Sequence, residues 1–246
     1  MDFYSSLAPE YDRMTRFDDR MQTESALLSK WVDPAKERSV LDAACGTGLH
    51  AILLAKMGIR VVGMDLSPEM TMQAGVNAKK AGVHVDFITG DMRCLGKELL
   101  AGFDAILCLG NTLPHLLKLK DLEKTFKGFF RLLNPGGFVL LQILNYDKIL
   151  KKKERIIGIH RKEGREFIRF NDFAGRFVDF NILTVTENQG KLDHTFNTTR
   201  LYPYKKRELA GALKKTGFWG MELFGNMEKT AFDPVTSPNL VIRAKK

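Results

Sequence analysis

Short apolar runs alternate with amphipathic stretches along the first part of the chain. The runs that predict strands cover residues 39–44, 60–64, 83–89, 103–109 and 138–144. Stretches with helical spacing lie between them, and the first 39 residues also have helical, amphipathic spacing. Strands that alternate with helices are typical of a parallel sheet covered on both faces. We therefore predict an α/β, Rossmann-like, doubly wound and mostly parallel seven-stranded sheet, with its last two strands near the C-terminus.

The pattern changes after about residue 154. Four consecutive runs with strand character cover residues 155–160, 166–172, 176–187 and 191–201. Glycine-containing turns separate them, which is typical of antiparallel hairpins. A helix over 205–216 and strands over 218–225 and 239–244 then follow. The antiparallel block is thus predicted to be an insertion after the fifth strand.

We expect one domain that covers the whole chain, residues 1–246. Its four parts are an N-terminal helical cap (1–39), a core (40–145), an antiparallel lid (155–201) and a return segment (202–246). A chain of this length can bury a full hydrophobic core without disulfides or structural metals. Because the return segment contains the last two expected strands, we predict that residues after the insertion complete the sheet.

Composition excludes several classes of protein. Hydrophobic residues make up 44% and charged residues 27%, which argues against a fibrous or wholly disordered chain. No apolar run reaches the roughly 18 residues of a membrane span, and the N-terminus lacks a secretory signal pattern. The three cysteines lack metal-ligand spacing, so we expect reduced thiols and no metal site. These features predict a cytoplasmic protein that does not bind membranes.

The net charge of +9 keeps nucleic acid among the partners to be tested. The basic clusters are short and scattered, with few aromatic residues between them, over residues 151–153, 205–207 and 245–246. This favours a solvated surface and a small-molecule partner. The sequence leaves the formation of a homo-oligomer open.

The sharpest local motif is the glycine turn VLDAACGTG over residues 40–48, at a strand-to-helix junction. Gly46 and Gly48 permit a tight turn and the close approach of a ligand to the backbone. Asp65 ends the second strand, where a carboxylate can accept hydrogen bonds from both ribose hydroxyls of an adenosine. These residues alone fit either a dinucleotide such as NAD or S-adenosylmethionine (SAM).

Two further acids favour SAM. Asp42 lies inside the glycine turn, where it can face the amino end of a methionine group, and Asp91 follows the third strand. Asp91 can accept from the adenine amino group while Met92 covers the ring. A pyrophosphate would prefer fewer carboxylates beside the turn, whereas SAM is a cation. The sequence therefore predicts SAM as the cofactor.

The segments VLDAACGTG, VVGMDLS, GDM and LNPGGF resemble the class I SAM-dependent methyltransferases over residues 38–145. Ala44 stands where that family has the first glycine of its turn. The segments FDAILCLGNTLPHL (103–116) and NYDKIL (145–150) further resemble glycine N-methyltransferase. The resemblance implies a small-molecule methyltransferase in which the antiparallel insertion roofs the substrate pocket.

The resemblance also assigns site residues. It implies that Arg20 binds the methionine carboxylate, that two N-terminal tyrosines close over SAM, and that Asn111, Tyr146 and Tyr202 face the acceptor. With the turn residues above, the predicted cofactor contacts are Tyr4, Tyr11, Arg20, Asp42, Ala44, Gly46, Gly48, Asp65, Leu66, Asp91, Met92, Leu109 and His115.

Two positions depart from the family pattern. Leu144 stands where the family has an arginine that binds the substrate carboxylate, and His194 stands where it has a tyrosine of the acceptor pocket. An unpaired buried carboxylate would cost several kcal/mol, so we expect an acceptor other than glycine. If glycine is nevertheless methylated, Arg169 or Arg200 from the lid would have to supply the missing charge.

These observations predict an enzyme that transfers a methyl group from SAM to a small molecule, with an amine as the favoured acceptor. Such an in-line displacement depends mainly on alignment of the reactants. Three alternatives stay open: a methyltransferase acting on RNA, an NAD-dependent oxidoreductase, and a non-catalytic nucleotide-binding module. No RNA-binding appendage is recognisable, and the segment Leu109-Gly110-Asn111-Thr112 lacks the NPPY-type signature of enzymes that methylate base amino groups.

Overall fold

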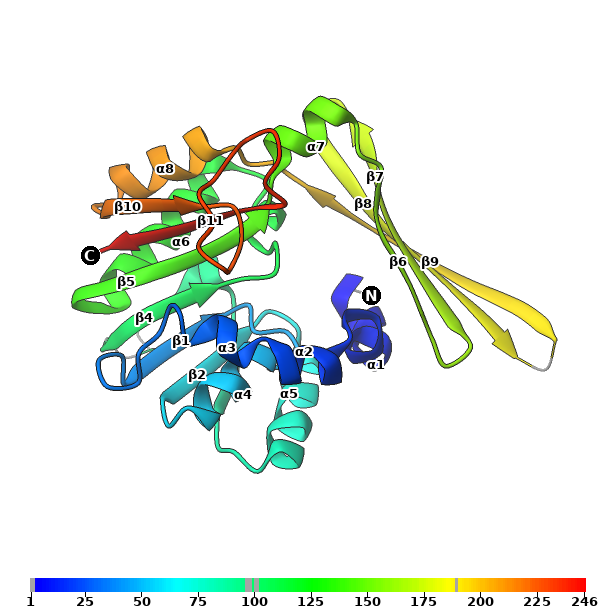
Figure 1. Cartoon of the computed structure of the whole chain (residues 1–246), viewed down its shortest axis with the longest axis horizontal. Coiled ribbons are helices and arrows are strands. Elements are labelled where there is room, and N and C mark those ends of the chain that lie inside the picture. The colour runs from blue at the N-terminus through cyan, green and yellow to red at the C-terminus, as the bar shows by residue number, and fades with distance from the viewer. Residues whose placement is uncertain (1–2, 96–98, 100–101, 189) are drawn as a thin grey trace.

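Two β-sheets organise the molecule in the computed structural model, which describes residues 3–95, 99, 102–188 and 190–246 (Figure 1). Sheet A has seven strands in the order β10-β11-β5-β4-β1-β2-β3. Its strands are β1 (Ser39–Ala43), β2 (Arg60–Asp65), β3 (Asp86–Thr89), β4 (Phe103–Cys108), β5 (Leu133–Leu144), β10 (Trp219–Phe224) and β11 (Asn239–Lys245). Strands β1 to β5 pair in parallel, whereas β11 is antiparallel to both β5 and β10. The predicted doubly wound, mostly parallel sheet is confirmed.

Helices cover both faces of sheet A, because the central strands are buried on both sides. They are α3 (Ser25–Leu28), α4 (Leu49–Lys56), α5 (Pro68–Ala81), α6 (Leu119–Leu132) and α8 (Lys206–Lys215). Buried side chains from β1, β4 and β5 point alternately into one hydrophobic cluster on each face. The N-terminus of α5 is the one that the sequence indicates: the Ser67 hydroxyl accepts from Met70 N, and Pro68 occupies the first helical position.

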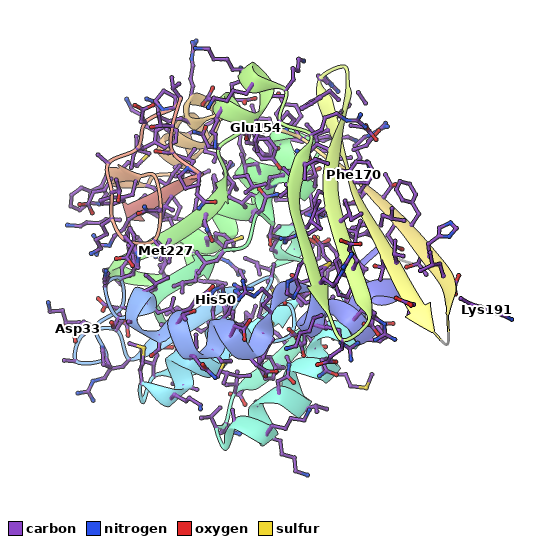
Figure 2. All side chains as sticks on the ribbon, turned by 45° about the vertical axis from the view of Figure 1, so that its right-hand side comes forward. Asp33, His50, Glu154, Phe170, Lys191 and Met227 are labelled. Atoms are coloured by element: carbon purple, nitrogen blue, oxygen red, sulfur yellow. The ribbon has the colours of Figure 1, made fainter. Side chains whose placement is uncertain are left out.

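Sheet B is the predicted antiparallel insertion. Its strands are β6 (Ile156–Lys162), β7 (Arg165–Ala174), β8 (Phe177–Asn188) and β9 (Lys191–Leu201), paired in sequence order. The β8–β9 hairpin extends well beyond the rest of the molecule, and Lys191 marks its far end (Figure 2). One face of sheet B turns toward sheet A, and the space between the two sheets holds the cavities described below.

Helices α1 (Phe3–Thr15) and α2 (Phe17–Thr23) lie between the two sheets (Figure 1). Leu7 and Met14 of α1 form a small apolar cluster with Phe167 and Ile182 of sheet B. On its other side, the Asp12 carboxylate of α1 accepts hydrogen bonds from Gln73 and Asn77 of α5. Helix α1 therefore joins sheet B to the core. None of the described helices is long and apolar enough to cross a membrane.

Two strand boundaries and one helix differ from those expected. Strand β3 begins at Asp86 instead of residue 83, because Val83 N bonds back to Ala78 O and completes the end of α5. Helix α7 (Tyr146–Lys152) is an element that the pattern did not indicate, and Asn145 caps it by accepting from Lys148 N. Strand β5 includes the NPGG turn and pairs with β4 through a register shift.

Candidate functional site

Two adjoining cavities lie at the carboxyl ends of the parallel strands, the edge at which open α/β sheets bind ligands. The first cavity lies over the turns that follow β1, β2 and β3, and the second lies between β5 and sheet B. Residues that line both cavities form a shared wall: Tyr4, Tyr11, Thr15, Arg20, Gly110 and His115. The two cavities are therefore direct neighbours.

Most of the predicted cofactor contacts line the first cavity. They are Tyr4, Tyr11, Arg20, Ala44, Gly46, Asp65, Leu66, Asp91, Met92, Leu109 and His115. These residues come from α1, α2 and the loops after β1, β2, β3 and β4, as expected for strand ends that meet at one edge. The fold thus brings the predicted cofactor contacts together, with Asp42 and Gly48 as the exceptions.

The glycine turn has a left-handed backbone at Ala44, Gly46 and Gly48. A Cβ at Gly46 would lie 3.6 Å from the Tyr11 ring, so glycine keeps the cavity open at this point. A Cβ at Gly48 would lie 3.0 Å from side-chain atoms of Ala74 and Phe87. Gly48 does not line the cavity, and its role in the structure is to let the turn pack closely on α5 and β3.

Asp42 lies beneath the first cavity and outside its lining, and it is 1% exposed. It accepts a hydrogen bond from the backbone of Ala51 in α4, while its Oδ2 is buried without a partner. Burial raises the pKa of Asp42 to about 6, although the nearby His50 opposes that shift. Asp42 therefore supports the start of α4, and its placement differs from the predicted contact with the methionine amino group.

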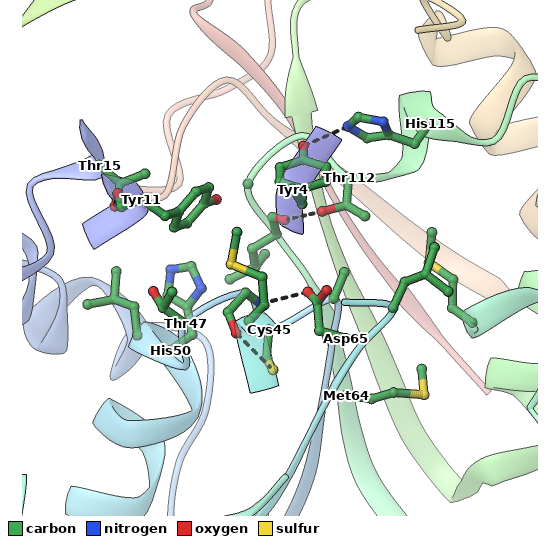
Figure 3. A pocket seen from close by; sticks show the side chains of 18 of the residues that line it. Tyr4, Tyr11, Thr15, Cys45, Thr47, His50, Met64, Asp65, Thr112 and His115 are labelled. Atoms are coloured by element: carbon green, nitrogen blue, oxygen red, sulfur yellow. Dashed lines mark hydrogen bonds between the residues drawn. The ribbon is translucent and has the colours of Figure 1, made fainter. Parts of the chain in front are cut away.

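Asp65 connects the turns that follow β1 and β2 (Figure 3). Its Oδ2 accepts from Gly46 N at 2.8 Å, and its Oδ1 accepts from Ser67 N at 3.0 Å. A carboxylate offers about four acceptor positions, so it can hold both turns and still accept from the two hydroxyls of a ribose. Asp65 lines the first cavity.

Asp91 is held by its neighbour Arg93, whose Nη2 lies 2.6 Å from Oδ2 and whose Nε bonds both oxygens. These hydrogen bonds lower the pKa of Asp91. An adenine amino group that binds to Asp91 would share the carboxylate with Arg93. Met92 lies beside it in the cavity lining.

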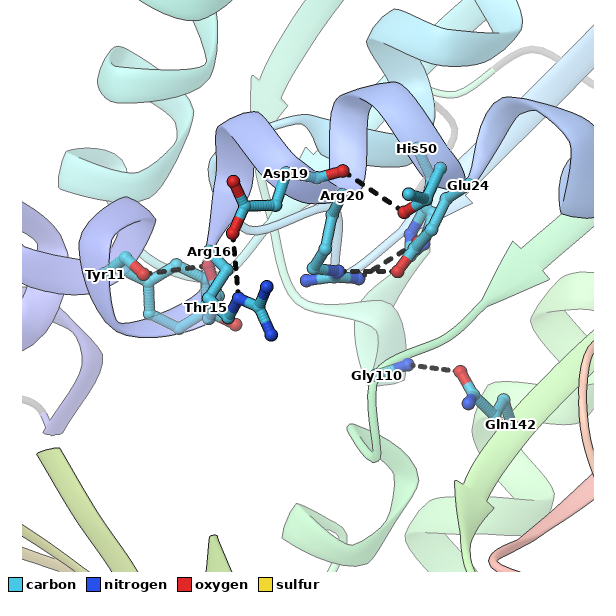
Figure 4. A network of polar contacts seen from close by, with 10 residues as sticks. Tyr11, Thr15, Arg16, Asp19, Arg20, Glu24, His50, Gly110 and Gln142 are labelled. Carbon is cyan, nitrogen blue, oxygen red and sulfur yellow. Dashed lines mark hydrogen bonds and ion pairs between the residues drawn. The ribbon is translucent and has the colours of Figure 1, made fainter. Parts of the chain in front are cut away.

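A charged network forms one end of the first cavity (Figure 4). Arg20 Nε donates to Glu24 Oε1 at 2.6 Å, and His50 Nε2 lies 3.0 Å from Glu24 Oε2. Burial alone would raise the pKa of Glu24, but the hydrogen bonds from His50 and Arg20 outweigh it and lower the pKa to about 2. Glu24 thus fixes Arg20, which can offer its remaining N–H groups to a carboxylate.

Sequence reasoning did not single out Glu24 or His50. One local signal was present, because Glu24 follows Arg20 by four residues, the spacing of an ion pair on one helix face. The approach of His50 depends on how α2 packs against α4, which local spacing does not specify.

The two N-terminal tyrosines belong to the shared wall. The Tyr4 hydroxyl and His115 Nε2 form a hydrogen bond of 2.8 Å, and the Tyr4 and Tyr11 ring centroids lie 6.3 Å apart (Figure 3). The hydrogen bond ties α1 to the short helical turn η2 (Leu113–His115) after β4. The wall between the cavities is therefore built from residues far apart in the sequence.

Asn111 lines the second cavity with a left-handed backbone. Its Nδ2 donates to the Tyr146 hydroxyl at 3.0 Å, and its Oδ1 accepts from Leu144 N at 3.0 Å. Tyr146 is 2% exposed and lies behind Asn111, outside the lining of either cavity. Tyr146 therefore holds Asn111 in place and does not itself reach the cavity.

The structure places Tyr202 and His194 away from both cavities. The Tyr202 hydroxyl donates to Glu208 Oε1 at 2.8 Å, and its ring packs on Tyr204 with centroids 4.7 Å apart. His194 is exposed on the protruding hairpin, where it pairs with Val185. Neither side chain lies in the acceptor position that the family resemblance implied.

The second cavity also contains a cation. Arg169 of β7 lines it together with Leu144, whereas Arg200 forms an exposed ion pair with Asp179. Of the two lid arginines named in the sequence analysis, Arg169 is therefore the one placed to supply the charge that Leu144 lacks. Among the described residues, no group of three or more His, Cys, Asp or Glu side chains is arranged to hold a metal ion.

Comparisons with known proteins agree with this architecture. The family profile described as "Methyltransferase domain" matches residues 40–137. A glycine/sarcosine N-methyltransferase of Halorhodospira halochloris is 27% identical over 94% of this chain and 84% of the relative. The glycine N-methyltransferase of Mus musculus is 33% identical over 45% of this chain and 42% of the relative.

Solved structures show the same fold. An S-adenosylmethionine-dependent methyltransferase from Clostridium acetobutylicum covers 99% of both chains with a TM-score of 0.82 and 20% identity. A SAM-bound amino pentose methyltransferase from Micromonospora echinaspora covers 96% of both chains with a TM-score of 0.72 and 19% identity. The profile match over the glycine turn and the relatives that extend along most of the chain identify this enzyme as a SAM-dependent methyltransferase.

Proposed function

We propose that this enzyme transfers the methyl group of SAM to the nitrogen of a small-molecule amine. The observation that carries the proposal is the wall shared by the two cavities, which includes Tyr4, Tyr11, Gly110 and His115. SAM in the first cavity and an amine in the second would meet at this wall. The similarity to glycine/sarcosine N-methyltransferases supports nitrogen as the methyl acceptor.

In this proposal the first cavity binds and orients the donor. Asp65 would accept from the ribose hydroxyls, Asp91 from the adenine amino group, and Arg20 would donate to the methionine carboxylate. SAM supplies an activated methyl group on a sulfonium, with a neutral thioether as leaving group. The enzyme's contribution is then alignment, since holding two reactants in line can remove much of the barrier.

The second cavity would hold the acceptor. Asn111 lies at its β5 side, and both of its side-chain ends are fixed by Tyr146 and by the backbone of Leu144. An amine attacks only as the neutral base, so the cavity must bind it with its lone pair free. Enclosure between β5 and sheet B would also keep water from competing for the methyl group. In this view sheet B is the roof of the acceptor site and the segment over residues 155–201 is the lid.

The first experiment is calorimetric titration with SAM, with its demethylated product S-adenosylhomocysteine, and with NAD. The second follows radiolabelled methyl transfer from SAM to panels of amines, phenols and tRNA. The proposal expects SAM binding well below the millimolar range and label in an amine. Label in phenols or tRNA alone, or binding of NAD without SAM, would contradict it.

Three predictions from the sequence remain with this proposal. They are a cytoplasmic location, a small-molecule partner in preference to nucleic acid despite the charge of +9, and a possible homo-oligomer. Gel filtration with light scattering measures the last, and the tRNA arm of the transfer assay addresses the second.

A further inference from the structure

Arg169 is an unusual residue for the inner face of sheet B. It lines the second cavity, and its Nε is buried without a hydrogen-bond partner. The ionisable groups that act on it are Tyr11 and a second cation, Arg20. Among the described residues, no carboxylate forms an ion pair with its guanidinium. A guanidinium stays protonated in proteins, so this partly buried positive charge has no negative partner among the described residues.

The surroundings of Arg169 accommodate the guanidinium but do not neutralise it. Gly158, its partner across the β6–β7 ladder, lies so close that a Cβ there would be 2.9 Å from Nη2. Ile157, Phe180 and Ile182 line the cavity around it. Withdrawing a charge from water is unfavourable unless a partner pairs with it. An anion that enters the cavity would supply that partner.

A second polar atom in the same cavity also lacks a partner. His160 of β6 lines it, and its Nε2 is buried without a hydrogen bond. His160 pairs across the ladder with Phe167, next but one to Arg169, so both side chains project from the same face of sheet B. In the tautomer that carries its hydrogen on Nε2, His160 can donate to an oxygen in this cavity. Arg169 and His160 thus present hydrogen-bond donors to the second cavity and no negative charge.

We propose that Arg169, assisted by His160, binds a carboxylate of the acceptor, so that the enzyme methylates short amines that carry an acid group. This rests on the proposed function, because it assigns the acceptor to the second cavity. Arg169 would determine specificity from sheet B, opposite the β5 side of the cavity, where Leu144 replaces the family arginine. The interaction with Tyr11 places it beside the shared wall, so a short amino acid spans from Arg169 to the methyl donor.

The test measures ligand binding without turnover. Protein saturated with S-adenosylhomocysteine is titrated with glycine, sarcosine and N,N-dimethylglycine, and each acid is compared with its carboxamide. The variants are Arg169→Gln and Arg169→Lys. Arg200→Gln is the matched control, because Arg200 lies on the same sheet in an exposed ion pair and lines neither cavity.

Wild-type protein should bind at least one acid about tenfold or more tightly than its amide, since hydrogen bonds to charged groups are of that strength. Arg169→Gln should abolish the preference and Arg200→Gln should keep it. Arg169→Lys should keep part of it, because lysine retains the charge but loses the planar fork. SAM affinity should stay within about threefold in all variants. The Arg169→Lys variant keeps the test decisive if the glutamine variant does not fold.

Four results would overturn the inference. They are equal binding of acids and amides by the wild type, no binding of either, a preference that survives Arg169→Gln, and a loss of SAM affinity in place of acid affinity. Failure of the proposed function is distinguishable, because it shows as absent SAM binding or as label in phenols or tRNA. The double variant Arg169→Leu with Leu144→Arg should regain acid preference if the cavity accepts the charge from either wall.

Discussion

Replacing Asp65 with alanine should affect both the stability of the free protein and its affinity for SAM. In the free protein the carboxylate accepts from Gly46 N and Ser67 N. Ser67 is 2% exposed, so its N–H would lose the Asp65 acceptor in a buried place, whereas the half-buried Gly46 N–H can bind water. We expect a loss of about 1.5–3 kcal/mol in unfolding free energy.

For a chain of this size such a loss lowers the melting temperature by about 3–12 °C. SAM affinity should fall at least about tenfold, because the ribose hydroxyls lose a charged acceptor worth more than about 1.4 kcal/mol. Calorimetry on the folded variant measures the affinity, and differential scanning measures the stability. Asp86→Ala is the control. Asp86 is exposed at the amino end of β3, away from the cavity at the carboxyl ends of the strands, and it contacts the exposed His84. A folded Asp65→Ala protein with wild-type SAM affinity would refute the reasoning.

Three further predictions concern acid stability, thiol reactivity and the basic cluster. The depressed pKa of Glu24 stabilises the fold above its unfolded value of 4.5, and this contribution is lost as the pH falls toward 2. Glu24→Gln should therefore flatten acid unfolding monitored by circular dichroism between about pH 4.5 and 2; an unchanged profile would contradict this. Iodoacetamide should label exposed Cys94 first, because burial raises the pKa of Cys45 and Cys108, and mass spectrometry of the native protein checks the order. Glutamine at residues 151–153 should leave methyl transfer unchanged, whereas a strong loss with steep salt dependence would indicate a nucleic-acid acceptor.

Local patterns were sufficient to predict sheet A. The alternation of strands and helices and the cap at Ser67 depend on neighbours within a few residues, and both are confirmed. Helix α7 was not predicted because it is short and only Asn145 separates it from β5, so no turn signal marks its start. The start expected for β3, residue 83, is wrong because the end of α5 extends into it. The closing turn of α5 uses Gly82 in a left-handed conformation and takes residues from the start of the expected strand.

The candidate site was predictable where the topology fixes it. Acids that follow successive parallel strands must meet at one edge, which is why Asp65 and Asp91 line the same cavity. The direction of one side chain within a turn is not fixed in this way. Asp42 and Gly48 belong to the same motif as Gly46, yet they face the packing beneath the turn.

Positions in the antiparallel sheet were harder to place from the sequence. The face that a strand residue occupies depends on the register, and a shift of one residue reverses it. His194 pairs with Val185 near the protruding end of the β8–β9 hairpin, so it is exposed although a family tyrosine aligns with it. Tyr202 lies just past the end of β9, and its hydroxyl donates a hydrogen bond to Glu208 at the start of α8.

Arg169 shows why a substitution at one aligned position does not determine the chemistry of a cavity. The acceptor cavity is bounded by β5, which carries Leu144, and by sheet B, which carries Arg169. These residues are 25 positions apart in the sequence, and only the fold brings them to one enclosed space. Electrostatic pairing depends on the distance between charges and on burial, and it is indifferent to which strand carries the cation. A leucine in the family's arginine position is therefore compatible with an acidic acceptor as long as the opposite wall provides the guanidinium, and the paired titration of acids and amides decides whether it does.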